Sequence, residues 1–144
     1  KRRIQAENSR LEEVLGLHWM TPIVHEGNLY AFSGRNEPDA KFRCVEFSTG
    51  KLLWDQDEAW QKYGPPSKKY GRGSFIQADG KLIVLGETGK LGLYALNAKK
   101  PVELAAYKVP LLRYPCWAAP SMANKRVYLR SESYLLCFDF AKKR

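Results

Sequence analysis

The sequence predicts an all-β protein built from β-propeller blades, and an internal repeat carries this prediction. Trp, Pro and Tyr in residues 19–30 recur at the same offsets in residues 117–128, and residues 72–83 form a more degenerate third copy. Each copy reads as an apolar run, a short polar turn and a second apolar run, which is the pattern of a β-hairpin. Hairpins that recur about every 50 residues are typical of a propeller rather than of a sandwich.

Three blades of antiparallel strands are expected, over residues 17–54, 71–109 and 116–140. The first two are expected to be four-stranded, and the third to stop after three strands. The expected strands are Met20–His25, Leu29–Ser33, Phe42–Ser48 and Lys51–Trp54, then Ser74–Gln77, Lys81–Leu85, Gly92–Leu96 and Val102–Val109, then Ala119–Ala123, Arg126–Arg130 and Tyr134–Phe140.

A closed propeller needs about 4–8 blades, so three blades do not complete a ring. We therefore expect the chain to be a fragment of a larger protein, with a ring of about seven or eight blades. A strand from elsewhere would then complete the third blade. Alternatively, several short chains close one ring as a homo-oligomer. Residues 1–16 are expected to be the end of a preceding blade or a basic N-terminal segment.

The net charge of +9 comes mostly from the two ends of the chain. Six of the 24 Lys and Arg residues lie within residues 1–3 and 142–144, which leaves 18 basic residues against 15 acidic ones. Because acidic residues are interspersed in this body, the charges indicate a solvated surface rather than a groove that follows phosphates. Nucleic acid is not an expected partner. No apolar run reaches the roughly 18 residues of a membrane span.

Cysteines and histidines form no readable chemical motif. Cys44, Cys116 and Cys137 lie in no C-x-x-C spacing, so the sequence shows neither a zinc knuckle nor a redox motif. We expect all three to be small buried residues. His18 and His25 belong to no recognisable catalytic triad or metal set.

The residues just before each inner strand are the first candidate binding site. Propeller geometry would place Trp19, Arg72 and Trp117 near one mouth of the central channel. Together they would stack a flat ligand or hold an anionic partner segment. The alternative is structural: both tryptophans pack between blades, and Arg72 pairs with a neighbouring acid.

A long loop over residues 55–70 is the second candidate, because loops of this length in compact repeats are often functional. Its aromatic residues and lysines would bind an acidic protein face or nucleic acid, or would fold back onto their own domain. These residues are Trp60, Tyr63, Lys68, Lys69 and Tyr70. Nothing in the sequence orients Asp55, Asp57 and Glu58, which are expected to be solvated turn residues. Residues 86–90 have the wrong spacing for a phosphate loop and are expected to form a hairpin turn.

The segment after the first hairpin carries a family resemblance. Cys44-x-Glu46-x-x-Thr49-Gly50-Lys51-x-x-Trp54 resembles the A-x-D-x-x-T-G-K-x-x-W repeat of the PQQ-like propeller family, where PQQ is pyrroloquinoline quinone. Ala95-Leu96-Asn97 and Cys137-Phe138-Asp139 keep parts of it. The chain is most similar to the C-terminal blades of bacterial PQQ-like repeat proteins, relatives of the outer-membrane-assembly propeller lipoprotein. Independently of the name, Thr49-Gly50 is expected to turn the chain into the outer strand, and Trp54 to pack between blades.

The resemblance implies a non-catalytic module for protein–protein interaction or scaffolding, in a periplasmic, cell-envelope or otherwise exported setting. Its contacts would be a protein partner or the remaining blades. The alternative is the C-terminal part of a PQQ-dependent quinoprotein dehydrogenase. Such enzymes hold calcium and PQQ on the central axis, usually beside a disulfide of adjacent cysteines. This sequence has no adjacent Cys-Cys pair. We therefore expect no catalytic, cofactor or metal site in this segment, and PQQ and calcium would need ligands from upstream blades.

Overall fold

The computed structural model describes residues 14–35, 39–59 and 69–141, and these residues form eleven β-strands. The all-β prediction is confirmed. The strands are β1 (Ile23–His25), β2 (Asn28–Ser33), β3 (Lys41–Glu46), β4 (Leu52–Asp57), β5 (Ser74–Ala78), β6 (Lys81–Leu85), β7 (Lys90–Ala95), β8 (Val102–Lys108), β9 (Ser121–Ala123), β10 (Arg126–Arg130) and β11 (Leu135–Asp139).

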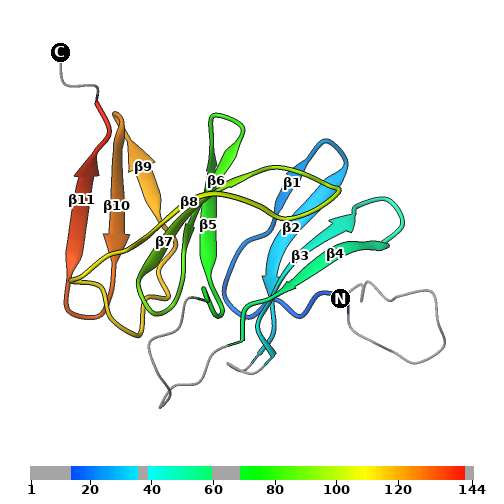
Figure 1. Ribbon diagram of the computed structural model, residues 1–144, viewed down its shortest axis with the longest axis horizontal. Helices are drawn as coiled ribbons and strands as arrows, with labels where there is room; N and C mark the ends of the chain where they lie inside the picture. The colour runs from blue at the N-terminus through cyan, green and yellow to red at the C-terminus, as the bar shows by residue number, and fades with distance from the viewer. Residues whose placement is uncertain (1–13, 36–38, 60–68, 142–144) are drawn as a thin grey trace.

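The strands form three separate antiparallel sheets, each made from consecutive strands. The first sheet has the order β1-β2-β3-β4, the second β5-β6-β7-β8, and the third β9-β10-β11. The sheets stand next to one another in chain order (Figure 1). Up-and-down sheets of this kind, stacked face against face, are consecutive blades of a β-propeller. We call them the first, second and third blade.

Some strand ends differ from the expected ones for clear reasons. The first strand begins at Ile23, after Pro22, because proline has no N–H to give to the ladder. The outer strand β4 continues to Asp57, which pairs with Lys41 at the start of β3. Asp55 and Asp57 therefore lie on a strand and not on the loop to which the sequence assigned them.

The inner hairpins turn on residues with positive φ. The two turn residues have φ of 49° and 75° at Glu26-Gly27, 49° and 65° at Asp79-Gly80, and 50° and 62° at Asn124-Lys125. Two successive positive φ values define the hairpin turn whose twist matches that of the flanking strands. The expected Thr49-Gly50 turn is also confirmed: Gly50 has a φ of 76°, and its N–H donates to the Glu46 carbonyl at 2.9 Å.

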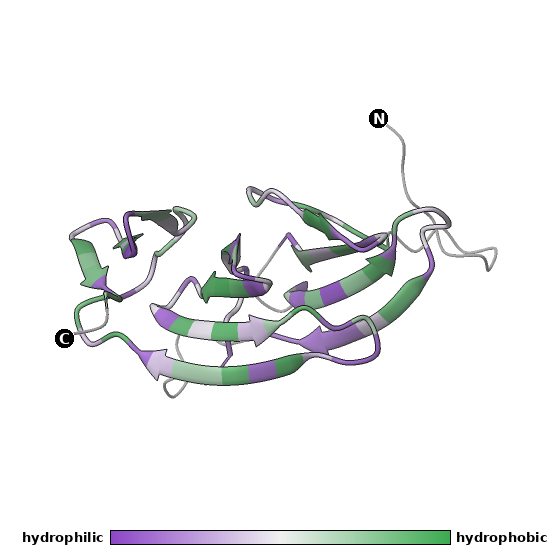
Figure 2. Cartoon of the chain, turned by 90° about the horizontal axis from the view of Figure 1, so that it is seen from above, coloured by the Kyte–Doolittle hydropathy of each residue, from purple (hydrophilic) through white to green (hydrophobic). Residues whose placement is uncertain are grey.

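Apolar and polar residues are mixed along the strands (Figure 2), and buried apolar side chains meet between the blades. Two hydrophobic clusters result. One lies between the first and second blades and includes Tyr30, Phe32, Phe42, Phe75, Leu82 and Tyr94. The other lies between the second and third blades and includes Leu85, Val109, Leu112, Cys116, Val127 and Leu129. We call these contacts the first and the second junction.

The expected role of Trp54 is confirmed. Its indole N–H donates to the Asn97 carbonyl of the second blade at 2.9 Å. Its ring packs edge-on against Phe42 at 5.1 Å. The cysteine expectation holds for Cys44 and Cys116, which are buried free thiols, but is wrong for Cys137, which is exposed on β11. Cys137 lies on the face of β11 that no described blade covers, whereas its neighbours Leu136 and Phe138 point to the other face and pack against the second hydrophobic cluster.

Candidate binding surface at the long-loop end

The two ends of the blades carry different connections. Because consecutive strands are antiparallel, the turns within each blade alternate between the ends (Figure 1). One end carries the tight inner hairpins described above. The other end carries the segment before β1 and the long connections β4–β5 and β8–β9. We call it the long-loop end. Longer loops held by a rigid scaffold are the usual place for binding residues.

The structure brings Trp19, Arg72 and Trp117 together at the long-loop end. The ring centroids of Trp19 and Trp117 are 5.5 Å apart. The Arg72 guanidinium carbon lies 4.7 Å from the centroid of the Trp19 ring. Three residues that come from the starts of three different blades thus form one contact. Whether they bind a ligand stays a prediction.

A buried ion pair fixes Arg72 in this position. Glu87 lies in the turn between β6 and β7, is fully buried, and its carboxylate lies 2.9 Å from Arg72 Nη2. The same carboxylate accepts a hydrogen bond from the Arg72 backbone N–H at 2.9 Å. Arg72 also donates from Nη1 to the Arg35 carbonyl at 3.0 Å. These contacts agree with the structural alternative for Arg72, in which its charge is matched by an acid.

Glu87 also connects the second blade to the third. Its backbone carbonyl accepts a hydrogen bond from Cys116 N–H at 2.8 Å. Residues 86–90 form the predicted turn, since Gly86 N–H donates to the Lys90 carbonyl at 2.8 Å.

Two more aromatic side chains extend the contact, and the sequence argument missed their role. The His18 ring lies 4.5 Å from Trp19, and the Tyr114 ring meets Trp117 edge-on at 5.9 Å. His18 is exposed, and 45% of Trp117 is exposed. In the sequence, the position of His18 next to Trp19 was the only indication that it belongs to this contact. Nothing in the sequence indicated a role for Tyr114. We call His18, Trp19, Tyr114 and Trp117 the aromatic cluster.

A cleft of about 560 Å³ opens beside the aromatic cluster. It reaches from Leu17 and His18 to the connection between β2 and β3. Arg35, Asp39 and Arg43 give it a polar lining. Arg43 is held there by a 2.7 Å hydrogen bond from Nη1 to the Val14 carbonyl.

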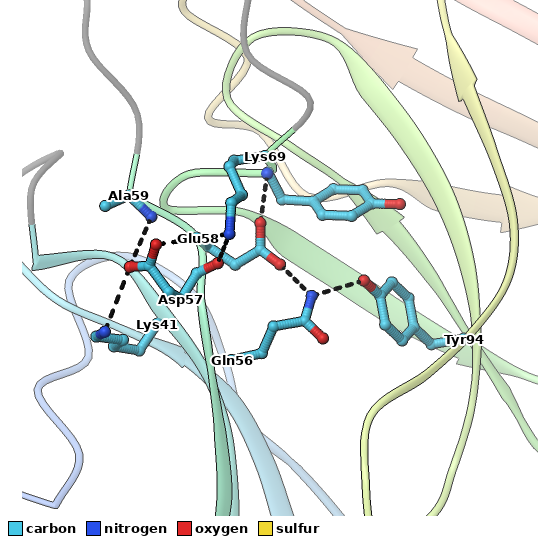
Figure 3. A network of polar contacts seen from close by, with 8 residues as sticks. Lys41, Gln56, Asp57, Glu58, Ala59, Lys69 and Tyr94 are labelled. Atoms are coloured by element: carbon cyan, nitrogen blue, oxygen red, sulfur yellow. Dashed lines mark hydrogen bonds and ion pairs between the residues drawn. The ribbon is translucent and has the colours of Figure 1, made fainter.

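The base of the predicted 55–70 loop is held by a polar network (Figure 3). Lys69 Nζ reaches the Asp57 carboxylate at 3.5 Å, and Lys41 reaches the same carboxylate at 3.3 Å. Glu58 Oε2 accepts the Tyr70 backbone N–H at 2.7 Å, and the Glu58 carbonyl accepts Gly71 N–H at 3.1 Å. The two ends of the loop are therefore held together where it leaves the blades.

Of the loop residues singled out in the sequence, Trp60, Tyr63 and Lys68 lie outside the described residues. Tyr70 is fully buried, and its ring therefore packs into its own domain rather than facing a partner. Gly92 makes room for it, because a Cβ at position 92 would lie 1.9 Å from the Tyr70 hydroxyl oxygen. Lys69 remains partly exposed, paired with Asp57.

Glu58 corrects another expectation, because it is a buried residue and not a solvated turn residue. Burial raises the pKa of its carboxyl group, and the hydrogen bonds from Tyr70 N–H and from Gln56 offset this only in part. Its neighbour Asp57 behaves in the opposite way. Slight burial opposes the change, but hydrogen bonds from Lys41 and Ala59 lower the pKa of Asp57.

Within the part of the chain that the structure describes, no group of three or more His, Cys, Asp or Glu side chains could hold a metal ion. No helix among these residues is long and apolar enough to cross a membrane.

The fold and this surface define a set of consecutive β-propeller blades with an aromatic cluster at one end. No protein-family model matches the sequence, and no curated protein matches it. Among solved structures, the chain is similar to BamB from Moraxella catarrhalis, with 16% identity and a TM-score of 0.46. The match covers 81% of this chain and 41% of that protein, so the chain spans less than half of that structure's length. The assignment to propeller blades rests on the sheet topology described above.

Proposed function

We propose that this chain is a non-catalytic protein-interaction module that contacts a partner protein through its long-loop end. The aromatic cluster is the observation that carries the proposal. Tryptophan and tyrosine are the residues most enriched at the centres of protein interfaces, where their large rings are buried against a partner. Here 45% of Trp117 and 41% of the nearby Leu17 remain exposed.

The charges at this surface favour an apolar contact over an anionic ligand. Glu87 already neutralises the charge of Arg72, a residue that is only 9% exposed. The buried Arg72 guanidinium therefore contacts the Trp19 ring and does not face a partner. The exposed ring surface is that of Trp117 and His18. The adjacent cleft gives a partner loop a concave place to enter.

The module belongs, on this proposal, to a larger ring of PQQ-like blades in the cell envelope or another exported compartment. The PQQ-like repeat of residues 44–54 supports both points. The proposal includes no PQQ and no calcium bound by this segment.

Site-specific photo-crosslinking in the source cells tests the proposal. A photoreactive phenylalanine analogue replaces Trp117 in one variant and Asp79, in the exposed β5–β6 hairpin, in the control variant. We expect a discrete crosslinked protein from position 117 and none from position 79. Equal crosslinking from both positions, or crosslinking from position 79 alone, would exclude the long-loop end as the binding surface.

A further inference from the structure

Among the described residues, two acidic side chains are fully buried, and their partners differ. Glu58 is 1% exposed and Glu87 is 0% exposed. The Glu87 carboxylate lies 2.9 Å from the Arg72 guanidinium, so its charge is matched by a cation. The Glu58 carboxylate instead accepts hydrogen bonds from the Tyr70 backbone N–H, at 2.7 Å, and from the side-chain amide of Gln56. Both of these donors are neutral. The charge of an ionised Glu58 is therefore buried without a cation in contact, which is the costly arrangement.

Two lysines next to Glu58 in the structure pair with its neighbour Asp57 instead. Lys41 Nζ lies 3.3 Å from the Asp57 carboxylate, and Lys69 Nζ lies 3.5 Å from it (Figure 3). Both pairs are partly exposed to solvent, and half of the Asp57 side chain is accessible. The two lysines are thus held at the surface, on the carboxylate that lies outside the junction.

A third lysine, Lys90 of β7, pairs with Glu103 of β8 at 3.4 Å. Glu103 also accepts a hydrogen bond from the Tyr94 hydroxyl at 3.1 Å, and the Tyr94 oxygen accepts one from Gln56 at 3.2 Å. Lys90 Nζ lies 3.9 Å from the centroid of the Tyr70 ring. These contacts form a ring of polar groups across the first junction, from β4 to β7 and β8. Within this ring, the ammonium group is in contact with the outer acid and not with the buried one.

The buried carboxyl group should therefore respond to pH. Burial raises the pKa of Glu58, and the hydrogen bonds from Tyr70 N–H and Gln56 and the charges of Lys69 and Lys90 offset this only in part. An opening that exposes the carboxylate to water removes the cost of burial. Such an opening is unfavourable below the unfolded pKa of about 4.3 and becomes more frequent as the pH rises through the folded pKa.

Glu58 holds the start of the second blade. Its side chain accepts Tyr70 N–H at 2.7 Å, and its backbone carbonyl accepts Gly71 N–H at 3.1 Å. We call these two contacts the Glu58 clamp. The next residue is Arg72, whose guanidinium lies on the Trp19 ring of the aromatic cluster. The Glu58 clamp thus fixes the backbone that carries the support of this cluster.

We propose that the Glu58 clamp is a pH-sensitive switch that regulates the binding surface at the long-loop end. When Glu58 is protonated, the clamp stays closed: one carboxyl oxygen accepts Tyr70 N–H, and the O–H donates to the Gln56 amide, which rotates to present its oxygen. When Glu58 is ionised, the clamp opens more often, Arg72 is held less firmly, and the aromatic cluster is less ordered for binding. The effect on binding rests on the protein-interaction function proposed above, whereas the opening of the clamp does not.

Hydrogen exchange of the intact chain, followed by NMR, tests the clamp. The protection of Tyr70 N–H and Gly71 N–H, corrected for intrinsic exchange, should fall at least about threefold from about pH 4.5 to about pH 7.5. The internal control is Cys116 N–H at the second junction, which donates to the Glu87 carbonyl and should keep its protection. Constant protection at Tyr70, or an equal fall at Cys116, would overturn the proposal.

Two further measurements assign the effect to Glu58. In E58Q, the protection of Tyr70 N–H should no longer depend on pH, whereas E132Q, at an exposed glutamate, should behave as wild type does. NMR of the Glu58 carboxyl carbon in the wild-type chain needs no variant, and its titration midpoint should lie above the usual value of about 4.3. A midpoint at or below that value would contradict the proposal.

The link to binding is tested by the crosslink from position 117, in cell extracts buffered at about pH 5 and about pH 7.5. We expect the yield to be at least about threefold higher at the lower pH, and E58Q to remove this difference. A yield that does not change with pH, beside a clamp that does open, would overturn the link to binding and leave the interaction function standing. No crosslink at either pH would refute the interaction function itself, and hydrogen exchange would still decide whether the clamp opens.

Discussion

The first and second junctions differ in the side chains that fill them. The first is aromatic: the Phe42 ring lies 4.8 Å from Phe32, 5.3 Å from Tyr94 and 5.9 Å from Phe75. The fully buried residues of the second junction are aliphatic or cysteine, namely Leu85, Val109, Leu112, Cys116, Val127 and Leu129. An outer strand with a tryptophan closes the first junction, and a groove lies open at the second.

This comparison shows how a repeat distributes stability. Each blade has the same hairpin pattern, but a large ring between blades removes more apolar surface from water than a leucine does. The fourth strand adds the last ring, Trp54, at the outside of the junction. At the second junction, no described strand of the third blade lies opposite β8, and the outer part of this junction is less completely filled.

The largest expected effect is loss of the Phe42 ring. Phe42 is 1% exposed and touches rings from both blades, so F42A should destabilise the chain by about 4 kcal/mol through lost burial and a residual cavity. The matched variant at the second junction is L129A, at a fully buried leucine, with an expected loss of about 3 kcal/mol. Urea unfolding of both variants measures the difference. A larger loss for L129A would reverse the ranking of the two junctions.

The Arg72–Glu87 ion pair is shared by both junctions, and breaking it should lower the free energy of unfolding by less than F42A does. E87Q leaves the Arg72 guanidinium buried without a compensating charge, and we expect a loss of about 3 kcal/mol. The control is D79N at the exposed Lys81–Asp79 pair, where asparagine tolerates the positive φ and the loss should be below about 0.5 kcal/mol. Equal stabilities of E87Q and wild type would show that the pair does not hold the blades together.

Much of this fold could be predicted from the sequence, because hairpins and tight turns are local. The Trp-Pro-Tyr repeat and the Gly-containing turns indicate strands that pair with their chain neighbours, and the structure confirms that arrangement. The packing of Trp54 between blades could also be predicted, since only a large ring suits that position of the motif. Local patterns, however, do not say which charges become buried.

The contacts of Arg72 and Glu58 illustrate what local reasoning missed. Glu87 lies in a turn that reads as an ordinary hairpin, and only the folded arrangement shows that its carboxylate holds Arg72. Glu58 reads as a solvated acid beside Asp57, yet it closes the base of a loop by accepting Tyr70 N–H. The contacts that hold these two buried acids join residues 12 and 15 positions apart in the sequence, and one sequence carries no periodic signal for such contacts.

The buried cysteines provide a direct measure of the two junctions. Cys44 belongs to the first junction and Cys116 to the second, and burial raises the pKa of both thiols, to about 11 for Cys116. Each thiol reacts only when its junction opens. We expect alkylation of Cys116 to be about tenfold faster than that of Cys44, a difference of about 1.4 kcal/mol in opening. Mass spectrometry of the alkylated native chain measures both rates, with exposed Cys137 as the fast internal reference. Faster modification of Cys44 would contradict the comparison.

The smallest expected effect is a difference in how Glu58 and Asp57, two neighbouring acids at the edge of the first junction, make stability depend on pH. The folded pKa of Glu58 is raised, so its stabilising contribution is present below its unfolded pKa of about 4.3 and is lost as the pH rises through the folded pKa. The folded pKa of Asp57 is lowered, so its contribution is present above about 3.9 and is lost as the pH falls. E58Q should therefore gain stability relative to wild type as the pH rises from about 4 to 7. D57N should be less stable than wild type above about pH 4, and this difference should shrink as the pH falls below about 3.9. Urea midpoints from about pH 3 to 7 would reveal the opposite pH dependences of the two variants, and dependences of the same sign would mean that Glu58 is as solvated as Asp57.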